Sequence, residues 1–185
     1  MQEAYKKEID QKMDKTVEVV ASEFRAVSTG KASAHLLDTV KVEAYGTSMP
    51  LNQVATVNAP EPRLLVVQAF DKGTVGDIIK GIQSADLGLN PIADGATIRV
   101  PIPALNEERR KEMARQCKNL AEEGRVAIRN IRRDANEHIK KLQKDKEVSE
   151  DQEHDLHDEI QKLTDNHTKK IDVLLAAKEK EVMEV

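Results

Sequence analysis

The chain has 185 residues, of which 39% are hydrophobic and 34% charged, so it can bury a sizeable core in one or two domains. No run approaches the roughly 18 apolar residues that span a bilayer, and the charged N-terminus lacks the apolar segment of a secretory signal. One cysteine, Cys117, allows no internal disulfide, as is usual in a reducing cytosol. We expect a cytoplasmic protein without membrane contacts, and the lack of a transit peptide favours a bacterial source.

The net charge of −4 is unevenly distributed along the chain. Residues 107–141 carry 11 Lys and Arg against 7 Asp and Glu, which gives a local charge of +4. Residues 145–185 carry 6 against 13, which gives a local charge of −7. The acidic overall pI of about 5.8 therefore conceals a basic element.

Residues 2–28 are predicted to form one amphipathic helix. Apolar residues recur there at spacings of three and four, the spacing of one helical face: Ile9, Met13, Val17, Val20, Phe24 and Val27. Gly30 ends the pattern. The Gly-Lys-Ala triplet that begins at Gly30 faintly resembles a phosphate-binding loop. The earlier glycine that such a loop needs is replaced by Arg25, so we discount nucleotide binding.

Residues 31–104 have a different character, with short runs of β-branched and apolar residues separated by Gly and Pro. These runs predict strands at 40–45, 52–57, 63–70 and 97–102. A short helix is predicted at 75–85, with Ile78, Ile79 and Ile82 on its buried side. Pro101 and Pro103 predict a stiff, extended exit from this small α/β module.

Helical periodicity returns at Asn106, a good N-cap, and continues without proline to about Lys146. Gly124 lies inside this helix, where glycine costs about 1 kcal/mol relative to alanine, and close helix packing is the expected reason for it. Ser149 and Gln152 match a capping box that begins a last helix.

Three long helices, each with one apolar stripe, must bury those stripes against one another. The first is separated from the other two by the strand-rich segment. The sequence therefore predicts an α+β fold, in which residues 1–29 and 105–185 form a long three-helix bundle. A small β/α/β domain, residues 30–104, is inserted through two short linkers.

The second long helix carries a row of basic residues on one face. Arg125, Arg129, Arg132 and Arg133 stand at i, i+4, i+7 and i+8; Asn136 continues the row, and Lys118 extends it towards the N-terminus. No acid interrupts the row on its own face, Glu122 being the nearest, and arginine can hold phosphate bidentately. A solvated charged stripe is the alternative interpretation.

Other chemistry has little support in the sequence. His154 and His157 could supply one pair of metal ligands, but no third ligand has a convincing spacing, so we predict a solvated acidic face and no metal. His167 and Cys117 lie on apolar stripes and are predicted to be core residues. No catalytic arrangement of Ser, His and Asp stands out, so we expect neither enzyme activity nor a cofactor.

The aromatic residues narrow the expected partner of the basic row. Tyr5, Phe24, Tyr45 and Phe70 are the only ones, and none lies on that row. Stacking on unpaired bases is therefore disfavoured. The expected target is structured RNA, contacted through its phosphates and its shape.

Seven segments, in order along the chain, resemble the ribosome recycling factor family. They are Met13-Asp14-Lys15, Thr29-Gly30-Lys31-Ala32-Ser33, Asp86-Leu87-Gly88-Leu89-Asn90-Pro91, Ile98-Arg99-Val100-Pro101, Glu108-Arg109-Arg110-Lys111, Arg125 to Asn136, and Lys146-Glu147-Val148-Ser149-Glu150-Asp151. Some are weak alone, but together they are highly specific. The resemblance implies an L-shaped, tRNA-sized protein with the architecture that periodicity predicts.

The resemblance also implies a function. The family binds the post-termination ribosome and, with the GTPase elongation factor G, splits it into subunits, which releases mRNA and tRNA. The bundle would lie on large-subunit ribosomal RNA. The positions that match the family's RNA contacts are Arg110, Arg129 and Arg132, with Arg133 and Asn136 in the same motif.

Motion between the domains is expected at a hinge formed by Gly30, Ala104 and Leu105. Ser28 departs from the family, which usually has a basic residue there, so an RNA contact beside the hinge is expected to be missing. We expect a monomer. The runner-up hypothesis is a coiled-coil adaptor whose bundle recruits protein partners.

Overall fold

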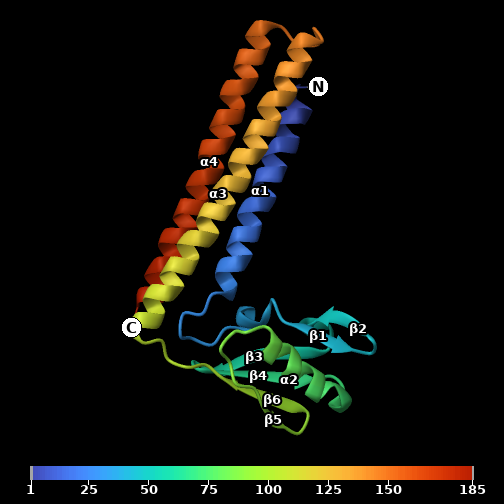
Figure 1. The fold of residues 1–185 in the computed structure, drawn as a ribbon, viewed down its shortest axis with the longest axis vertical. Coiled ribbons are helices and arrows are strands. Elements are labelled where there is room, and N and C mark those ends of the chain that lie inside the picture. The colour runs from blue at the N-terminus through green and yellow to red at the C-terminus, as the bar shows by residue number, and fades with distance from the viewer. Residues whose placement is uncertain (1, 185) are drawn as a thin grey trace. The chain divides into compact units, whose positions relative to one another are not determined.

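The computed structural model describes residues 2–184 (Figure 1). Contacts within the chain group it into two compact units, one formed by residues up to Phe24 and from Ala114 onward, the other by Arg25–Met113. The first unit is helical and the second holds the strands, which confirms the α+β class predicted from the sequence. No helix among residues 2–184 is both long enough and apolar enough to cross a membrane.

The helical unit is built from α1 (Gln2–Ala26), most of α3 (Glu107–Lys144) and α4 (Glu150–Met183). α1 and α4 run in the same direction, because Lys6 contacts Glu159 and Asp14 contacts His167 further along both helices. α3 runs the other way. Apolar residues of all three helices fill the bundle core: Ile9, Met13, Val20, Phe24, Cys117, Ala121, Ile128, Ala135, Ile139, Leu156, Ile160, Ile171 and Val182.

Gly124 lies at a place where side chains of α1 and α4 press against the backbone of α3. A Cβ atom at this position would lie 2.5 Å from Val20 Cγ2 of α1 and 3.1 Å from Ile171 Cδ1 of α4. Real Cβ atoms do not approach a neighbour at the first of these distances. The close packing predicted for this glycine is therefore confirmed.

Both predicted helix caps are present. The side chain of Asn106 accepts a hydrogen bond from the backbone N–H of Arg109 at 2.8 Å, just before α3 begins. Ser149 and Gln152 make the reciprocal bonds of a capping box at 3.2 and 2.9 Å. These bonds satisfy backbone N–H groups that the first turn of a helix leaves without partners.

The second unit contains two antiparallel sheets. β1 (Lys41–Ala44) and β2 (Thr47–Pro50) form a hairpin, and four further strands are arranged in the order β3-β4-β6-β5. Their bounds are Ala55–Glu61 for β3, Leu64–Ala69 for β4, Ile92–Asp94 for β5 and Thr97–Pro101 for β6. Three of the four predicted runs contain a strand, whereas the run at 52–57 overlaps only the first three residues of β3, because Leu51–Gln53 forms a 3-10 helix. β2 and β5 were not predicted. Three short 3-10 helices connect these elements, at Ala34–Leu37, Leu51–Gln53 and Lys72–Thr74.

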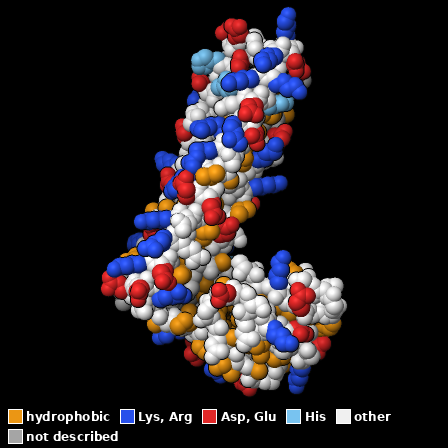
Figure 2. Space-filling view, in the orientation of Figure 1, with side chains coloured by type: hydrophobic (Ala, Val, Ile, Leu, Met, Phe, Trp, Pro, Cys, Tyr) orange, Lys and Arg blue, Asp and Glu red, His pale blue; other side chains and the backbone are white. Residues whose placement is uncertain are grey.

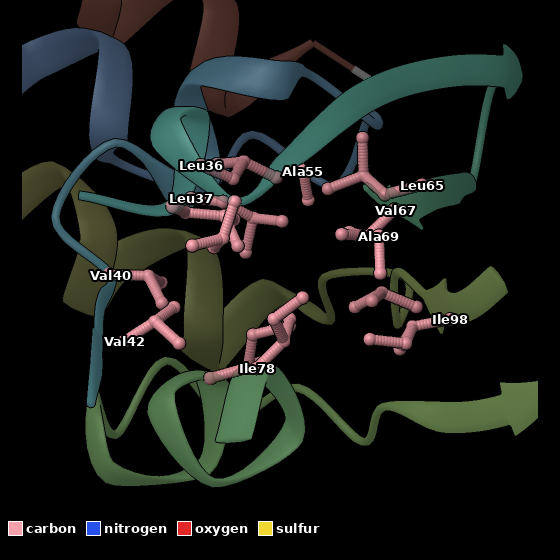
Figure 3. Close-up of a cluster of buried hydrophobic side chains, with 14 of the residues drawn as sticks. Leu36, Leu37, Val40, Val42, Ala55, Leu65, Val67, Ala69, Ile78 and Ile98 are labelled. Carbon is pink, nitrogen blue, oxygen red and sulfur yellow. The ribbon is translucent and has the colours of Figure 1, made fainter. Parts of the chain in front are cut away.

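α2 (Val75–Ser84) packs on this unit's core (Figure 3). Ile78 and Ile82 are buried as predicted, and Ile79 is partly buried against the same cluster. A Cβ atom at Gly81 would lie 2.6 Å from the carbonyl oxygen of Lys41, so α2 passes directly against the backbone of β1. Close approach therefore requires glycine in the cores of both units.

Candidate nucleic-acid interface

Four residues of the predicted basic row reach across to α4. We call them the α3–α4 ladder. Its rungs are Lys118 Nζ with Glu179 Oε1 at 3.9 Å, Arg125 Nη2 with Asp172 Oδ1 at 2.7 Å, Arg132 Nη1 with Gln161 Oε1 at 3.3 Å, and His157 Nδ1 with Asn136 Oδ1 at 2.8 Å. The residue numbers rise on α3 as they fall on α4, as two antiparallel helices require.

Arg125 is the most firmly held residue of the ladder. Its Nε and Nη2 atoms both donate to Asp172 Oδ1, at 3.0 and 2.7 Å, and its Nη1 donates to Glu122 at 3.1 Å. Only 22% of its side chain is exposed. The hydrogen bond to Asp172 is the main reason why the pKa of Arg125 is raised. This guanidinium therefore has little capacity left for an external anion.

Arg129 and Arg133, which we call the outer arginines, are placed differently. Arg129 Nη2 donates to Glu122 on its own helix at 2.7 Å, and its side chain is 45% exposed. Arg133 is 68% exposed, with Nε 4.0 Å from the carboxylate of its neighbour Asp134. Within residues 2–184, neither has a hydrogen bond or ion pair to α4. The outer arginines therefore present their guanidinium groups to solvent.

Glu122 requires a correction to the sequence interpretation. The row was expected to be free of acids, but Glu122 accepts hydrogen bonds from both Arg125 and Arg129. The reason is helical geometry, since positions three and seven residues apart lie on one face. Bonds from Arg129 first, and then from Arg125, lower the pKa of Glu122. Any anion that bound these two arginines would have to displace this carboxylate. Basic and acidic side chains are interspersed along the bundle face drawn in Figure 2.

The other predicted contact and hinge residues lie in the second unit. Arg110 is half-buried in the first turn of α3. Gly30 has φ +80, and a Cβ atom there would lie 3.4 Å from Leu105 Cγ, so these two predicted hinge residues are neighbours. Ala104 is exposed. The Ser28 hydroxyl accepts from the Gly30 N–H at 3.4 Å.

The histidines and the cysteine follow the predictions in part. His154 is exposed and lies 3.3 Å from Asp158, but His157 is only 27% exposed because it belongs to the ladder, so the prediction of a solvated residue was wrong for it. Cys117 is fully buried as predicted, and burial raises the pKa of its thiol.

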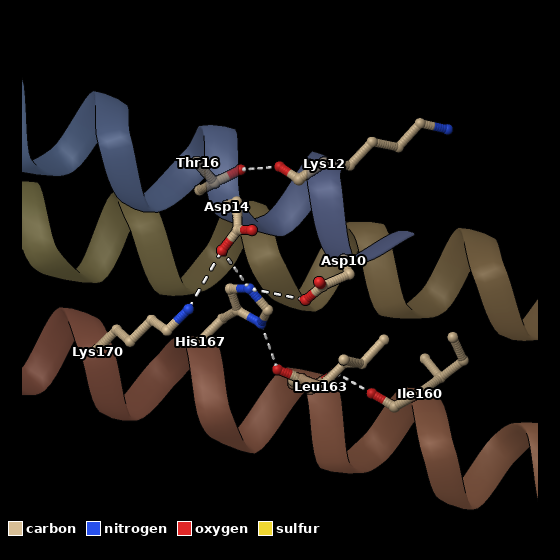
Figure 4. Close-up of polar contacts among 9 residues, drawn as sticks. Asp10, Lys12, Asp14, Thr16, Ile160, Leu163, His167 and Lys170 are labelled. Atoms are coloured by element: carbon tan, nitrogen blue, oxygen red, sulfur yellow. Dashed lines mark hydrogen bonds and ion pairs between the residues drawn. The ribbon is translucent and has the colours of Figure 1, made fainter. Parts of the chain in front are cut away.

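His167 is buried as predicted, yet two carboxylates of α1 approach its ring (Figure 4). The sequence interpretation missed this contact. The available signal was the pair Asp10 and Asp14, which lie one helical turn apart and flank the buried Met13.

Known proteins match this chain along its length. The family model described as ribosome recycling factor matches residues 20–183. The chain belongs to the ribosome recycling factor family. A ribosome-recycling factor of Rhodospirillum centenum is 54% identical over 179 residues, which are 97% of each chain. One from Alkaliphilus metalliredigens is 48% identical over 185 residues and all of both chains. The family resemblance seen in the seven segments is thereby confirmed.

Solved structures of the family have the same fold. A solution structure of the ribosome recycling factor is 40% identical and has a TM-score of 0.77, with 100% of this chain and 98% of that chain covered. A second match, with a TM-score of 0.66, 45% identity and full coverage of both chains, comes from models of the T. thermophilus ribosome recycling factor and the E. coli elongation factor G bound to the E. coli post-termination complex.

Proposed function

We propose that this protein binds the post-termination ribosome and, together with elongation factor G, separates the ribosome into subunits so that mRNA and tRNA are released. It acts as a cytoplasmic monomer without catalytic activity of its own. Family membership supports this proposal, as does the structural relative described with elongation factor G on a post-termination complex. The basic residues of α3 are its binding surface for large-subunit ribosomal RNA.

The exposure of the outer arginines is the observation that carries the proposal. Exposed ion pairs such as the one between Arg129 and Glu122 contribute little net free energy, so a phosphate can replace the carboxylate at small cost. The guanidinium group of Arg132 is also weakly bound, because its partner Gln161 is a neutral amide. The three guanidinium groups can therefore turn to RNA without opening the bundle.

The remaining predicted contacts contribute in other ways. Arg125, Lys118 and Asn136 contact α4 and are thereby oriented along the row, while the two cations add positive potential. Arg110 supplies a further contact from the first turn of α3. With no aromatic residue in this set, the recognition is of phosphates at fixed distances and not of base identity.

Co-sedimentation with large ribosomal subunits over a range of salt concentrations tests this binding mode. If three to five phosphates are contacted, the logarithm of the affinity should fall against the logarithm of the salt concentration with a slope of about −2 to −5. A flat response would instead support the adaptor that recruits proteins. Light scattering of ribosomes mixed with the protein, elongation factor G and GTP then measures splitting directly.

We further propose that Gly30, Ala104 and Leu105 form the pivot of the inserted domain. Gly30 occupies the left-handed region at φ +80, which a β-branched residue strongly disfavours. In Gly30→Val, the rate of subunit splitting should fall more than the affinity for the large subunit, because binding belongs to α3. Equal losses of splitting rate and affinity would show that these three residues are not the pivot of the inserted domain.

A further inference from the structure

Three possible metal ligands converge where α1 meets α4. Asp10 and Asp14 lie one turn apart on α1, and the ring of His167 projects between them from α4 (Figure 4). His167 Nε2 is 2.9 Å from Asp14 Oδ1 and 3.3 Å from Asp10 Oδ1. The three ligand atoms all lie within 4.8 Å of one another. Among residues 2–184, no other cluster of His, Cys, Asp and Glu meets that criterion.

The orientation of the His167 ring is fixed from behind. Its Nδ1 lies 2.7 Å from the backbone carbonyl oxygen of Leu163, and a carbonyl can only accept, so Nδ1 carries the hydrogen. In a neutral imidazole, Nε2 then holds a lone pair, and here that lone pair faces two carboxylates. Such an arrangement needs a positive species at Nε2, which either a proton or a bound cation can supply. Histidines that bind metals are commonly fixed in this way, with the other ring nitrogen donating to a carbonyl.

The spacing of the ligand atoms suits a small divalent ion. Ligands about 2.0 to 2.2 Å from a tetrahedral zinc ion lie roughly 3.3 Å from one another, which is close to the separations of Nε2 from both carboxylates. The side chains of Asp10 and Asp14 are 45% and 49% exposed, so small rotations can adjust their oxygens. The histidine itself is buried, and its ring is oriented by the contact with Leu163.

The site also has an entrance. A groove of about 650 Å³ is lined by Asp10 and His167 together with Leu163, Asn166 and other residues of α1 and α4. It can admit an ion and leave room for a water molecule as the fourth ligand. An ion bound there would connect α1 to α4 through Asp14 and His167, which are 153 residues apart in sequence.

One positive group competes for the same carboxylate. Lys170 Nζ lies 3.2 Å from Asp14 Oδ1, but its side chain is 55% exposed and can swing into solvent. Lys169 also lines the groove. A divalent ion must therefore displace the Lys170 contact before it can bind Asp14.

From this geometry we infer that Asp10, Asp14 and His167 form a zinc-binding site that ties α1 to α4. His167 is its imidazole ligand, the two aspartates supply oxygen ligands, and water completes the shell. Nitrogen and oxygen donors in this combination suit zinc better than magnesium or calcium, which prefer oxygen alone. The site is separate from the basic row of α3, so the inference does not depend on the proposed function.

The test is zinc binding by the full chain after treatment with a chelator. Calorimetry with ZnCl₂ should show one site per chain, and zinc should raise the melting temperature, because it binds the folded state alone. Co²⁺ in the same site should give the visible absorption of tetrahedral coordination. Asp10→Asn and Asp14→Asn keep the side-chain shape and should each lower zinc affinity at least about tenfold.

Two more variants distinguish a zinc site from a simple ion pair and from zinc held elsewhere on the surface. Lys170→Gln removes the competing cation and should raise zinc affinity, an effect that a purely structural ion pair does not predict. His154→Gln removes the exposed pair with Asp158 and should leave zinc binding unchanged. Failure of zinc to bind, or equal binding by the aspartate variants, would overturn the site and leave His167 as a protonated link between the helices. Loss of binding in His154→Gln would assign the zinc to the surface.

Discussion

α4 packs against α3 on one side and against α1 on another. We call these two contact regions the α3 seam and the α1 seam, and charged residues are arranged differently in them. On the α3 side, the cations belong to a ladder whose partners include a neutral amide at Arg132, and the outer arginines lie beyond it. On the α1 side, positive and negative groups are matched across the helices, as in Lys6 with Glu159. His167 lies fully buried between two carboxylates there.

The two arrangements differ in how much free energy is needed to break their contacts. Exposed pairs cost little to break, so cations on the α3 side can exchange a carboxylate for a phosphate. A buried ring with both nitrogens engaged is costly to disturb, because a polar group left without a partner in the core loses its full hydration. The α1 seam therefore fixes the helices, while the α3 seam remains able to bind an external anion.

The largest expected effect comes from removing the outer arginines. The double variant Arg129→Ala/Arg133→Ala loses two charge-assisted contacts of about 1.5 to 3 kcal/mol each, so affinity for the large ribosomal subunit should fall at least about a hundredfold. Its melting temperature should change little, because neither side chain bonds to another helix. Affinity is measured by co-sedimentation and stability by circular dichroism.

The control removes the same charge from α1. Lys12→Ala/Lys15→Ala deletes two exposed cations of that helix. If affinity depends on the face that α3 presents, this variant should bind close to normally. An equal loss in both double variants would mean that net charge alone governs binding, and the contrast between the two seams would have no functional meaning.

Gly124 tests the packing that both seams share. In Gly124→Ala the new methyl group would meet Val20 and Ile171, and overpacking of this kind costs about 1 to 3 kcal/mol. The contact at 2.5 Å places this cost in the upper part of that range, at about 2 to 3 kcal/mol, because the β-branched side chain of Val20 cannot easily move aside. The better helix propensity of alanine returns about 1 kcal/mol, so the net loss of stability should be about 1 to 2 kcal/mol. Denaturant unfolding measures it. A variant as stable as the parent would show that the helices can separate at this point without cost.

The sequence was informative where local chemistry decides the structure. Apolar spacing and caps located the three long helices, and the bonds of Ser149 and Gln152 are those that the pattern predicts. β2 and β5 were missed because they are short and lie mostly on the surface, so no alternation of buried and exposed residues marks them.

Contacts between helices were the part that the sequence could not supply. The row on α3 was visible from spacing, but the partners Asp172 and Gln161 lie on another helix, and periodicity does not give the rotation of one helix against another. His167 was correctly expected in the core. Its approach to Asp14 depends on the alignment of α1 with α4, which only the packed bundle defines.

A smaller effect is expected from Arg125, the most firmly held rung of the ladder. Arg125→Ala leaves the half-exposed carboxylate of Asp172 in contact with water, so stability should fall by less than about 1 kcal/mol. The loss is read from the midpoint of urea unfolding at low salt and again at high salt, where screening should shrink it. A loss of several kcal/mol would mean that the α3 seam is as rigid as the α1 seam.

The smallest expected effect concerns acid and the α1 seam. The hydrogen bond from His167, followed by that from Lys170, holds the pKa of Asp14 below its ordinary value. A carboxyl group with a lowered pKa in the folded state stabilises the fold above its unfolded pKa of about 3.9, and this contribution is lost as the pH falls through the folded pKa. The melting temperature of the parent protein should therefore drop as the pH is lowered below about 4.

Asp14→Asn isolates this contribution, because the variant keeps the side-chain shape but cannot take up the proton. It should melt at a lower temperature than the parent near pH 6, and the gap should narrow steadily as the pH falls below about 4. Melting is followed with a chelator present, so that no metal ion contributes. Asp165→Asn, at an exposed acid of α4, serves as the control and should track the parent at every pH. A gap that stays constant down to low pH would show that the carboxylate of Asp14 adds no charge-dependent stability to this seam, and the two seams would then differ in burial alone.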